Sequence, residues 1–290
     1  MLGRDAAEHK VLIVKTLQKK NHVVAMTGDG VNDAPAIKSA DIGIAMGSGT
    51  EVAKNAGRMI LTDDNFATIV HAVHVGRALY DDLLKYIRFM LTVLVAYVTT
   101  FLIASVLNIA AGQPLSAGQI LWINFAVTAP IGVTLGMDKE EPGLMLRRPR
   151  PRATAIMTPA VMVTVGLAGL FMAGSLDTLI AYGKNHYGSY TLGSTMALTS
   201  FALMLFVAAY QSRSQTESTF RQSTFDNPRL NKVVGIELFV ALLLTRGGAL
   251  SDLLGTVRLT HTQWALAIAP AVALFVLWEL GKLIARRRHA

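Results

Sequence analysis

The chain has 290 residues, of which 52% are hydrophobic and 16% charged, and its formal net charge is +8. A soluble domain carries about 25% charged residues, so this composition favours a membrane protein. The sequence contains no cysteine, which excludes disulfides and cysteine metal sites.

The first informative segment is a glycine-rich turn at residues 26–36, which reads Met-Thr-Gly-Asp-Gly-Val-Asn-Asp-Ala-Pro-Ala. The apolar run Val23–Met26 before it predicts a short buried strand, and a helix is expected after it. Glycines let the backbone bend closely around a ligand, and a helix N-terminus offers free N–H groups. The carboxylates of Asp29 and Asp33 can hold a hard cation. The turn therefore predicts a phosphate and Mg²⁺ site.

The pattern from this turn to Arg88 is that of a mixed α/β domain. We expect a helix near Ala36, followed by a strand at Ile42–Ala45, a helix at Glu51–Ala56 and a strand at Met59–Leu61.

A long helix is predicted to begin after Asn65, whose side chain can accept from the first free N–H groups as an N-cap. Neither Gly nor Pro interrupts the sequence between Arg77 and the apolar run that starts at Phe89. We expect this helix to continue into the membrane as one stiff rod.

Six apolar segments follow, and a bilayer span needs about 20 largely apolar residues. Buried helices of a soluble protein are the alternative, but six such segments in the rest of the chain make it improbable. The fourth and fifth segments are short or have polar edges. The predicted spans are 86–108, 117–135, 155–179, 195–210, 233–245 and 263–284.

The basic residues predict the orientation of these spans, because positive charge marks the cytoplasmic side of a membrane. They gather in alternate loops and in the C-terminal tail, which include Arg147, Arg148, Arg213, Arg229 and Arg287. We expect an integral protein of the plasma (inner) membrane with both termini cytoplasmic. The positive charges are then topology signals that touch anionic lipid rather than a surface for nucleic acid.

The string at 26–36 closely resembles the hinge motif of P-type ATPases, which are ion pumps that pass through an aspartyl-phosphate. The resemblance continues through residues 41–50, 61–70 and 76–80, and it is strongest to the branch that pumps calcium and related cations. It implies an α/β fold over residues 1–80, the C-terminal half of a Rossmann-like phosphorylation domain of the haloacid dehalogenase (HAD) type. An all-α transmembrane domain of six helices would occupy residues 81–290.

The resemblance also implies roles for single residues. Asp29 would be a Mg²⁺ ligand, Asn32 and Asp33 would support the phosphate and the metal, and Lys10 would neutralise phosphoryl charge. Backbone donors near the phosphate would come from Thr27, Gly28 and Gly30.

Two motifs of the family do not occur in these 290 residues. The Asp-Lys-Thr-Gly string carries the phosphorylated aspartate, and the Thr-Gly-Glu-Ser string carries the dephosphorylating glutamate. We therefore expect a C-terminal segment of a cation pump that uses Mg²⁺ and ATP, with ATP bound mainly by an upstream domain, and that is catalytically incomplete alone. The alternatives are a non-catalytic membrane protein that binds a phosphate ligand, or a split-pump subunit completed in trans by a separate N-terminal fragment.

The predicted transport site departs from the calcium-pumping branch. Aligned on Arg88, the Asn and Glu positions of the first span hold Leu94 and Tyr97. In the second span Asn124 is kept, but the Thr and Asp positions hold Val127 and Thr128. No carboxylate remains in the core of either span, whereas Ca²⁺ takes about six to eight oxygen ligands with negative charge among them.

A site built from Asn124, Thr128, the Tyr97 hydroxyl and carbonyls freed near Pro130 would bind Ca²⁺ weakly. Three alternatives stay open: a fourth span upstream supplies the charge, the cargo differs, for example a monovalent cation or a polar or amphipathic molecule, or transport is lost. Asn124 can equally serve as an interhelical hydrogen bonder. Glu237, an acid inside the fifth span, is a further candidate.

Overall fold

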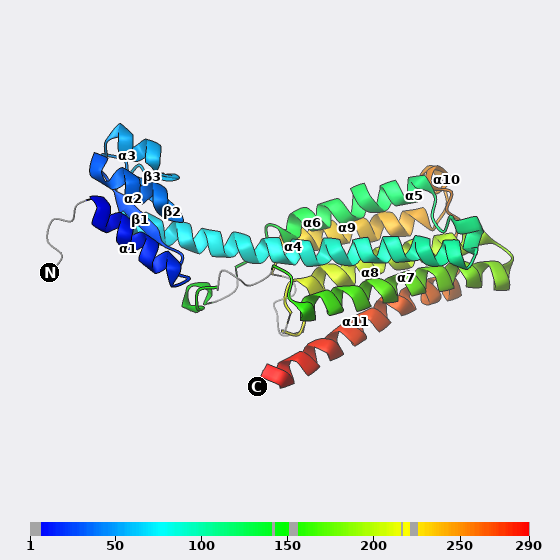
Figure 1. The fold of residues 1–290 in the computed structure, drawn as a ribbon. Helices are drawn as coiled ribbons and strands as arrows, with labels where there is room; N and C mark the ends of the chain where they lie inside the picture. Colours follow the sequence, from blue (N-terminus) through cyan, green and yellow to red (C-terminus); the bar gives the residue numbers. More distant parts are fainter. Residues whose placement is uncertain (1–6, 141–142, 151–155, 216, 221–225, 290) are drawn as a thin grey trace. The chain divides into compact units, whose positions relative to one another are not determined.

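The structure, a computed structural model, describes residues 7–140, 143–150, 156–215, 217–220 and 226–289 (Figure 1). The chain divides into two units. The first, called here the α/β unit, comprises residues 1–78 and 141–155, and the second, the helical unit, comprises residues 79–140 and 156–290.

The α/β unit contains a three-stranded parallel sheet in the order β1-β2-β3. Ala25 pairs with Ile42 and Ile44 pairs with Met59, and helices connect the strands as parallel pairing requires. Ile37, Ala45 and Ala53 form a small buried core between sheet and helices. The elements are α1 (Ala7–Lys19), β1 (Ala25–Gly28), η1 (Val31–Asp33), α2 (Ala34–Ser39), β2 (Ile42–Met46), α3 (Glu51–Ala56) and β3 (Met59–Leu61).

The first strand differs from its predicted bounds, because β1 begins at Ala25 rather than Val23. The Val24 N–H donates to the side chain of Asp41 at 2.9 Å, and the Val24 carbonyl accepts from Ile42 N at 3.2 Å. The Val24 N–H thus has a side-chain partner in place of a strand partner, and β1 starts two residues later than predicted. The predicted bounds of α3 and β3 are confirmed.

One helix, α4 (Phe66–Val106), contributes residues to both units. Its start is capped as predicted, because the Asn65 side chain accepts from Ala67 N at 2.9 Å. No break interrupts it over its 41 residues.

The helical unit continues with helices of very different length (Figure 1). Its central helix is α8, whose residues Phe201, Ala202 and Leu205 are fully buried. The elements after α4 are η2 (Ile109–Gly112), α5 (Ala117–Trp122), η3 (Ile123–Thr128), α6 (Ala129–Leu135), α7 (Pro159–Tyr187), α8 (Tyr190–Ser212), α9 (Pro228–Leu244), α10 (Ala249–Leu254) and α11 (His261–His289); η4 (Leu144–Leu146) belongs to the α/β unit.

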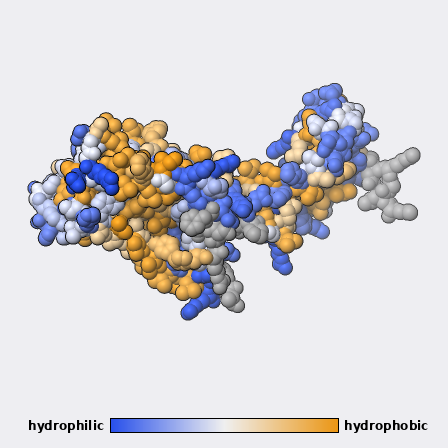
Figure 2. Space-filling model, turned by 180° about the vertical axis from the view of Figure 1, so that it is seen from behind, coloured by the Kyte–Doolittle hydropathy of each residue, from blue (hydrophilic) through white to orange (hydrophobic). Residues whose placement is uncertain are grey.

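Within the described residues, five helical stretches are long and apolar enough to cross a membrane: α4, residues 117–135, α7, α8 and α11. The fifth predicted span, 233–245, is not confirmed, because α9 has 17 residues and carries Asn231, Lys232 and Glu237. The predicted start of the third span, Ala155, lies outside the described residues. Figure 2 shows apolar side chains covering a broad surface of the helical unit. Leu102, Leu167 and Val272 are among the exposed apolar residues of this unit.

Helices α7 and α8 approach each other closely at two glycines. A Cβ on Gly183 would overlap the backbone of Gly193, so only glycine fits at this crossing. Small residues at a helix contact let backbones meet and increase van der Waals contact, which is a main source of helix association in lipid.

A buried carboxylate, that of Asp138, connects four helices at one end of the helical unit. Its Oδ2 accepts from Lys85 Nζ of α4 at 3.0 Å and from Arg213 Nε at the end of α8 at 2.9 Å. Its Oδ1 accepts from the Asn227 side chain at the start of α9 at 2.9 Å. Asp138 itself follows α6, and its side chain is 2% exposed. Two charged donors and one amide donor therefore bind the two oxygens of this carboxylate.

The pKa of Asp138 reflects two opposing effects. Burial acts to raise it, but the Arg213 hydrogen bond and the positive charges of Lys85 and Arg213 hold it below the usual value. A carboxyl whose folded pKa lies below its unfolded value stabilises the fold above the unfolded pKa, about 3.9. That contribution is lost as the pH falls through the lower folded value.

We predict that Asp138→Asn lowers the stability of the helical unit by about 3–5 kcal/mol, since it leaves buried cations without their counter-charge. Thermal unfolding in lipid should show this loss at pH 7 and a smaller difference between variant and wild type at acid pH.

The neighbouring Lys139 provides the control, because it forms an exposed pair with Asp226 at 3.7 Å. Lys139→Gln should change stability by less than about 0.5 kcal/mol. Equal effects of the two substitutions would contradict the role assigned to Asp138.

Candidate functional site

The predicted phosphate site lies in the loop that follows β1, at the carboxyl end of the parallel sheet. Ligands of open α/β folds bind at this edge, because loops and helix N-termini meet there. Gly28 ends β1, Gly30 precedes η1, and Pro35 lies in the first turn of α2. A Cβ on Gly28 would overlap the side chain of Asp33, so the close approach of strand and loop requires glycine.

Asp33 holds the loop in shape. Its Oδ2 accepts from Gly30 N at 3.1 Å and Asp29 N at 3.3 Å, and its Oδ1 accepts from Lys10 Nζ at 2.6 Å. Burial acts to raise the pKa of Asp33, but the hydrogen bonds from Lys10, Gly30 and Asp29 hold it below its usual value. Asp33 is therefore an ionised structural group, and Lys10 is its counter-ion.

Asp29 differs from Asp33 although the two lie in the same turn. Its side chain is exposed, and within the described part of the chain its carboxylate makes no hydrogen bond or ion pair. Its backbone is held from the other side, since its carbonyl accepts from Thr50 N at 2.8 Å. Asn32 is exposed on η1, and Thr27 is half-buried in β1.

These residues fit Mg²⁺ only in part. Among the described residues no group of three or more His, Asp or Glu side chains converges on one point. Mg²⁺ is held in phosphoryl-transfer sites by one or two carboxylates together with phosphate oxygens and water. The free carboxylate of Asp29 suits one such position, whereas the oxygens of Asp33 already accept from three donors.

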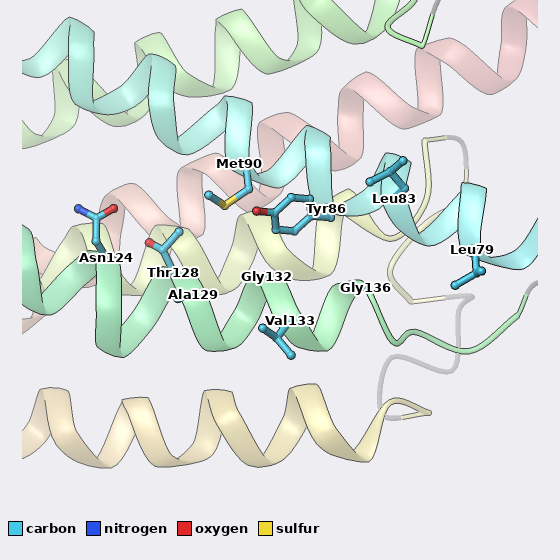
Figure 3. A pocket seen from close by; sticks show the side chains of 10 residues that line it. All are labelled: Leu79, Leu83, Tyr86, Met90, Asn124, Thr128, Ala129, Gly132, Val133 and Gly136. Atoms are coloured by element: carbon cyan, nitrogen blue, oxygen red, sulfur yellow. The ribbon is translucent and has the colours of Figure 1, made fainter.

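Two of the predicted transport residues, Asn124 and Thr128, line a cavity of about 560 Å³ between α4 and the η3–α6 segment (Figure 3). Tyr97, Pro130 and Glu237 are not among its lining residues. Tyr86 and Met90 of α4 line one side, and Asn124 and Thr128 line the other. The remaining lining residues are Leu79, Leu83, Ala129, Gly132, Val133 and Gly136.

The polar atoms of this cavity are neutral. The Asn124 side-chain amide donates to Ile120 O at 2.9 Å and to the Tyr97 hydroxyl at 3.5 Å. Thr128 is 2% exposed, and its hydroxyl has no partner among the described residues. Leu94 and Val127 do not line the cavity, since Leu94 is exposed and Val127 belongs to the core.

The backbone at Asn124 is locally unwound. Residues Ile123–Thr128 form a π-helix, in which Ala129 N donates to Asn124 O, five residues back. Single turns of this kind are frequent at functional sites. Pro130 follows directly and has no N–H, so a carbonyl one turn earlier lacks its usual donor. The segment therefore contains a carbonyl oxygen without its usual helix donor.

Glu237 lies apart from the cavity, buried in α9, and its Oε2 has no partner among the described residues. Neither Asp138 nor Asp177, a buried acid of α7, was among the predicted site residues. The signal for Asp177 is its place inside the third predicted span, where an acidic residue is costly.

Comparison with known proteins gives two family matches. Residues 112–284 match the family described as Cation transporting ATPase, C-terminus, and residues 9–73 match the haloacid dehalogenase-like hydrolases. A dehalogenase-type α/β unit followed by helices able to cross a membrane defines the class, which is that of the P-type ATPases. The chain belongs to the cation-transporting branch of this class.

Curated relatives agree with this assignment. The chain is 36% identical over 290 residues to Calcium-transporting ATPase 1 of Schizosaccharomyces pombe, an alignment that covers 99% of the chain and 32% of the relative. It is 36% identical over 292 residues to a Calcium-transporting ATPase of Bacillus subtilis, with coverage of 99% and 32%. It is 34% identical over 289 residues to the Probable cation-transporting ATPase F of Mycobacterium tuberculosis, and this alignment covers 99% of the chain and 32% of the relative. The chain thus spans about a third of the length of these relatives.

We predict that Asp33→Asn loosens the loop after β1, because three donors then face an amide in place of a carboxylate. The expected cost is about 1–3 kcal/mol, seen as faster hydrogen exchange at the amides of Asp29 and Gly30. Asp29→Asn is the matched control with the same charge change, and it should leave this exchange unaltered. Equal acceleration in both variants would contradict the division between the two carboxylates.

Proposed function

We propose that these residues form part of an ATP-driven cation pump, carrying its Mg²⁺ and phosphate loop and its later membrane helices. The observation that carries the proposal is the free carboxylate of Asp29, presented at the sheet edge by a loop that Asp33 and Thr50 hold in place. An exposed acid on a rigid loop suits metal binding better than fold stability.

Each residue of the loop has a part in this proposal. Asp29 would bind Mg²⁺, which neutralises phosphoryl charge during transfer. The N–H groups near Thr27, Gly28 and Gly30 would orient phosphate oxygens, with Asn32 at the edge of the site. The ammonium group of Lys10 is bound to the Asp33 carboxylate. Lys10 would therefore act on the phosphate through Asp33, or it would alternate between the Asp33 carboxylate and the phosphate.

The phosphorylated aspartate and most of the ATP site would come from outside these 290 residues, since no Asp-Lys-Thr-Gly string occurs among them. By this proposal the chain alone is catalytically incomplete. A separate N-terminal fragment acting in trans would serve as well as a covalently joined one.

Helix α4 would transmit the phosphorylation event to the membrane. It runs without interruption from Phe66, just after β3, to Tyr86 and Met90 at the cavity and on to Val106. A continuous helix is stiff along its axis, so a displacement at its start need not be absorbed in a loop.

The cargo would be a cation that the chain contacts through neutral oxygens. Asn124, Thr128 and the carbonyls freed near Pro130 supply these, with Tyr97 beside them. Relatives are named calcium-transporting, but Ca²⁺ would need negative charge from a segment outside this cavity. The protein would lie in the plasma (inner) membrane with both termini cytoplasmic and its apolar surface in lipid.

We predict that Asp29→Asn abolishes Mg²⁺-dependent phosphorylation by radiolabelled ATP, with a loss of about 100-fold or more. The assay uses the full-length protein, or this chain expressed with an N-terminal fragment. Glu51→Gln is the control, because Glu51 is exposed and pairs with Lys54 of the same helix, α3. Phosphorylation of an aspartate in the 290-residue chain alone would refute its incompleteness. Absence of ATP hydrolysis in every form would favour a non-catalytic binding protein.

We predict that Thr128→Asp raises the apparent Ca²⁺ affinity of ATP hydrolysis about tenfold or more, because it adds a carboxylate where Asn124 and free carbonyls already stand. Thr128→Asn, similar in shape but uncharged, is the control and should not raise it. A similar gain in both variants would mean that charge at the cavity does not limit Ca²⁺ binding.

A further inference from the structure

Asp177 is an acidic residue in the interior of α7, one of the helices long and apolar enough to span a membrane. The residue is 3% exposed, and neither carboxyl oxygen has a hydrogen-bond partner among the described residues. This is unlike Asp138, whose carboxylate accepts from three side chains. Asp177 does not line the cavity at Asn124.

The side of α7 that carries Asp177 faces protein. Ala173 and Ile180, which lie one turn before and after it, are both fully buried. Thr178, the next residue, is exposed, and its hydroxyl donates to Gly174 O at 2.6 Å. The carboxyl group is therefore held away from both lipid and water.

The elements packed against α7 are α8, α11, η2 and, at Gly169, α4 near Val95. Helix α8 carries no charged side chain and only Tyr190 and Tyr210 as titratable groups, and η2 carries none. Beyond Phe89, α4 has Tyr97 alone. The ionisable groups of α11 are His261 at its start and those from Glu279 onward at its far end.

The charged groups of α7 itself gather near its end and have partners of their own. Lys184 Nζ lies 5.0 Å from the centre of the Tyr190 ring. The His186 ring stacks on Tyr182 at 5.0 Å and contacts Tyr187 edge-on. No described cation is therefore paired with Asp177.

An ionised carboxylate without a donor is among the costliest groups that an apolar interior can hold. A proton removes the charge and needs neither a cavity nor further ligands, whereas a metal cation would need several oxygens around it. The geometry thus favours the proton over any other cation as the species bound at Asp177.

We propose that Asp177 is a proton-binding site inside the membrane unit, loaded with H⁺ in this conformation and separate from the cation cavity. When the α7 packing opens to water, the carboxyl group releases that proton to solvent and becomes a carboxylate, which rebinds H⁺ on closure. This exchange rests on the proposed pump function, whereas the proton binding does not.

The first test is infrared spectroscopy of the protein in lipid at neutral pH. The C=O stretch of a protonated, unbonded carboxyl group should be present in the wild type, absent in Asp177→Asn and retained in Thr178→Val. Glu237 is a second buried acid with an unpaired oxygen among the described residues, and Glu237→Gln removes its carboxyl group. In a protein that already carries Glu237→Gln, adding Asp177→Asn should abolish the same C=O band. An unchanged band in Asp177→Asn overturns the proposal.

Asparagine reproduces the shape and neutrality of a protonated aspartic acid, so Asp177→Asn should fold at least as well as the wild type. Failure of this variant to accumulate in membranes would also overturn the proposal, because it would mean that the ionised form is needed.

The second test measures proton movement in vesicles that contain the full-length protein and a trapped pH dye. The number of protons moved per transported cation should fall in Asp177→Asn and not in Thr178→Val, and an unchanged ratio would overturn the exchange step. If the wild type transports no cation, the proposed pump function fails, and the infrared result still decides whether Asp177 binds a proton.

Discussion

Polar groups buried in an apolar helical unit must find their partners within the protein, and Asp138 meets this constraint most fully. One carboxylate joins α4, the end of α6, the end of α8 and the start of α9 through Lys85, Arg213 and Asn227. Asn227 ties the same point to the backbone by donating to Thr134 O and accepting from Leu230 N. The positions of α4 and α6, which enclose the cavity, depend on this cluster.

The same principle separates groups that stabilise from groups that can act. In the loop after β1, Asp33 is saturated by Lys10, Gly30 and Asp29, while the carboxylate of Asp29 stays free. In the helical unit Asp138 is saturated, while Asp177 has no partner among the described residues. Our proposals rest on Asp29 and Asp177. An acid without a partner raises the free energy of the folded protein, and binding of a ligand or a proton can remove that cost.

The cavity between α4 and η3–α6 combines neutral side chains with an irregular backbone. Asn124 and Thr128 are amide and hydroxyl groups, and the π-helical turn before Pro130 adds carbonyl oxygen. Irregular backbone at membrane depth is tolerated where protein or a cavity lines it. This arrangement is the basis of our proposal of a cation path of low charge density, and the chain belongs to the cation-transporting ATPases.

Much of this protein follows from local sequence. Asn65 caps α4, and Glu51–Ala56 and Met59–Leu61 form the predicted helix and strand. The string at 26–36 identifies the family. Capping, periodicity and motif spacing each act within a few residues, so the sequence alone predicts them. Tertiary contacts decided the rest. The side chain of Asp41 accepts from Val24 N, 17 residues away in the sequence, so β1 starts at Ala25. The partners of Asp138 lie up to 89 residues away, and the burial of Asp177 depends on the helices around it. Such distant groups meet only after folding, and no local pattern encodes which of them will be satisfied.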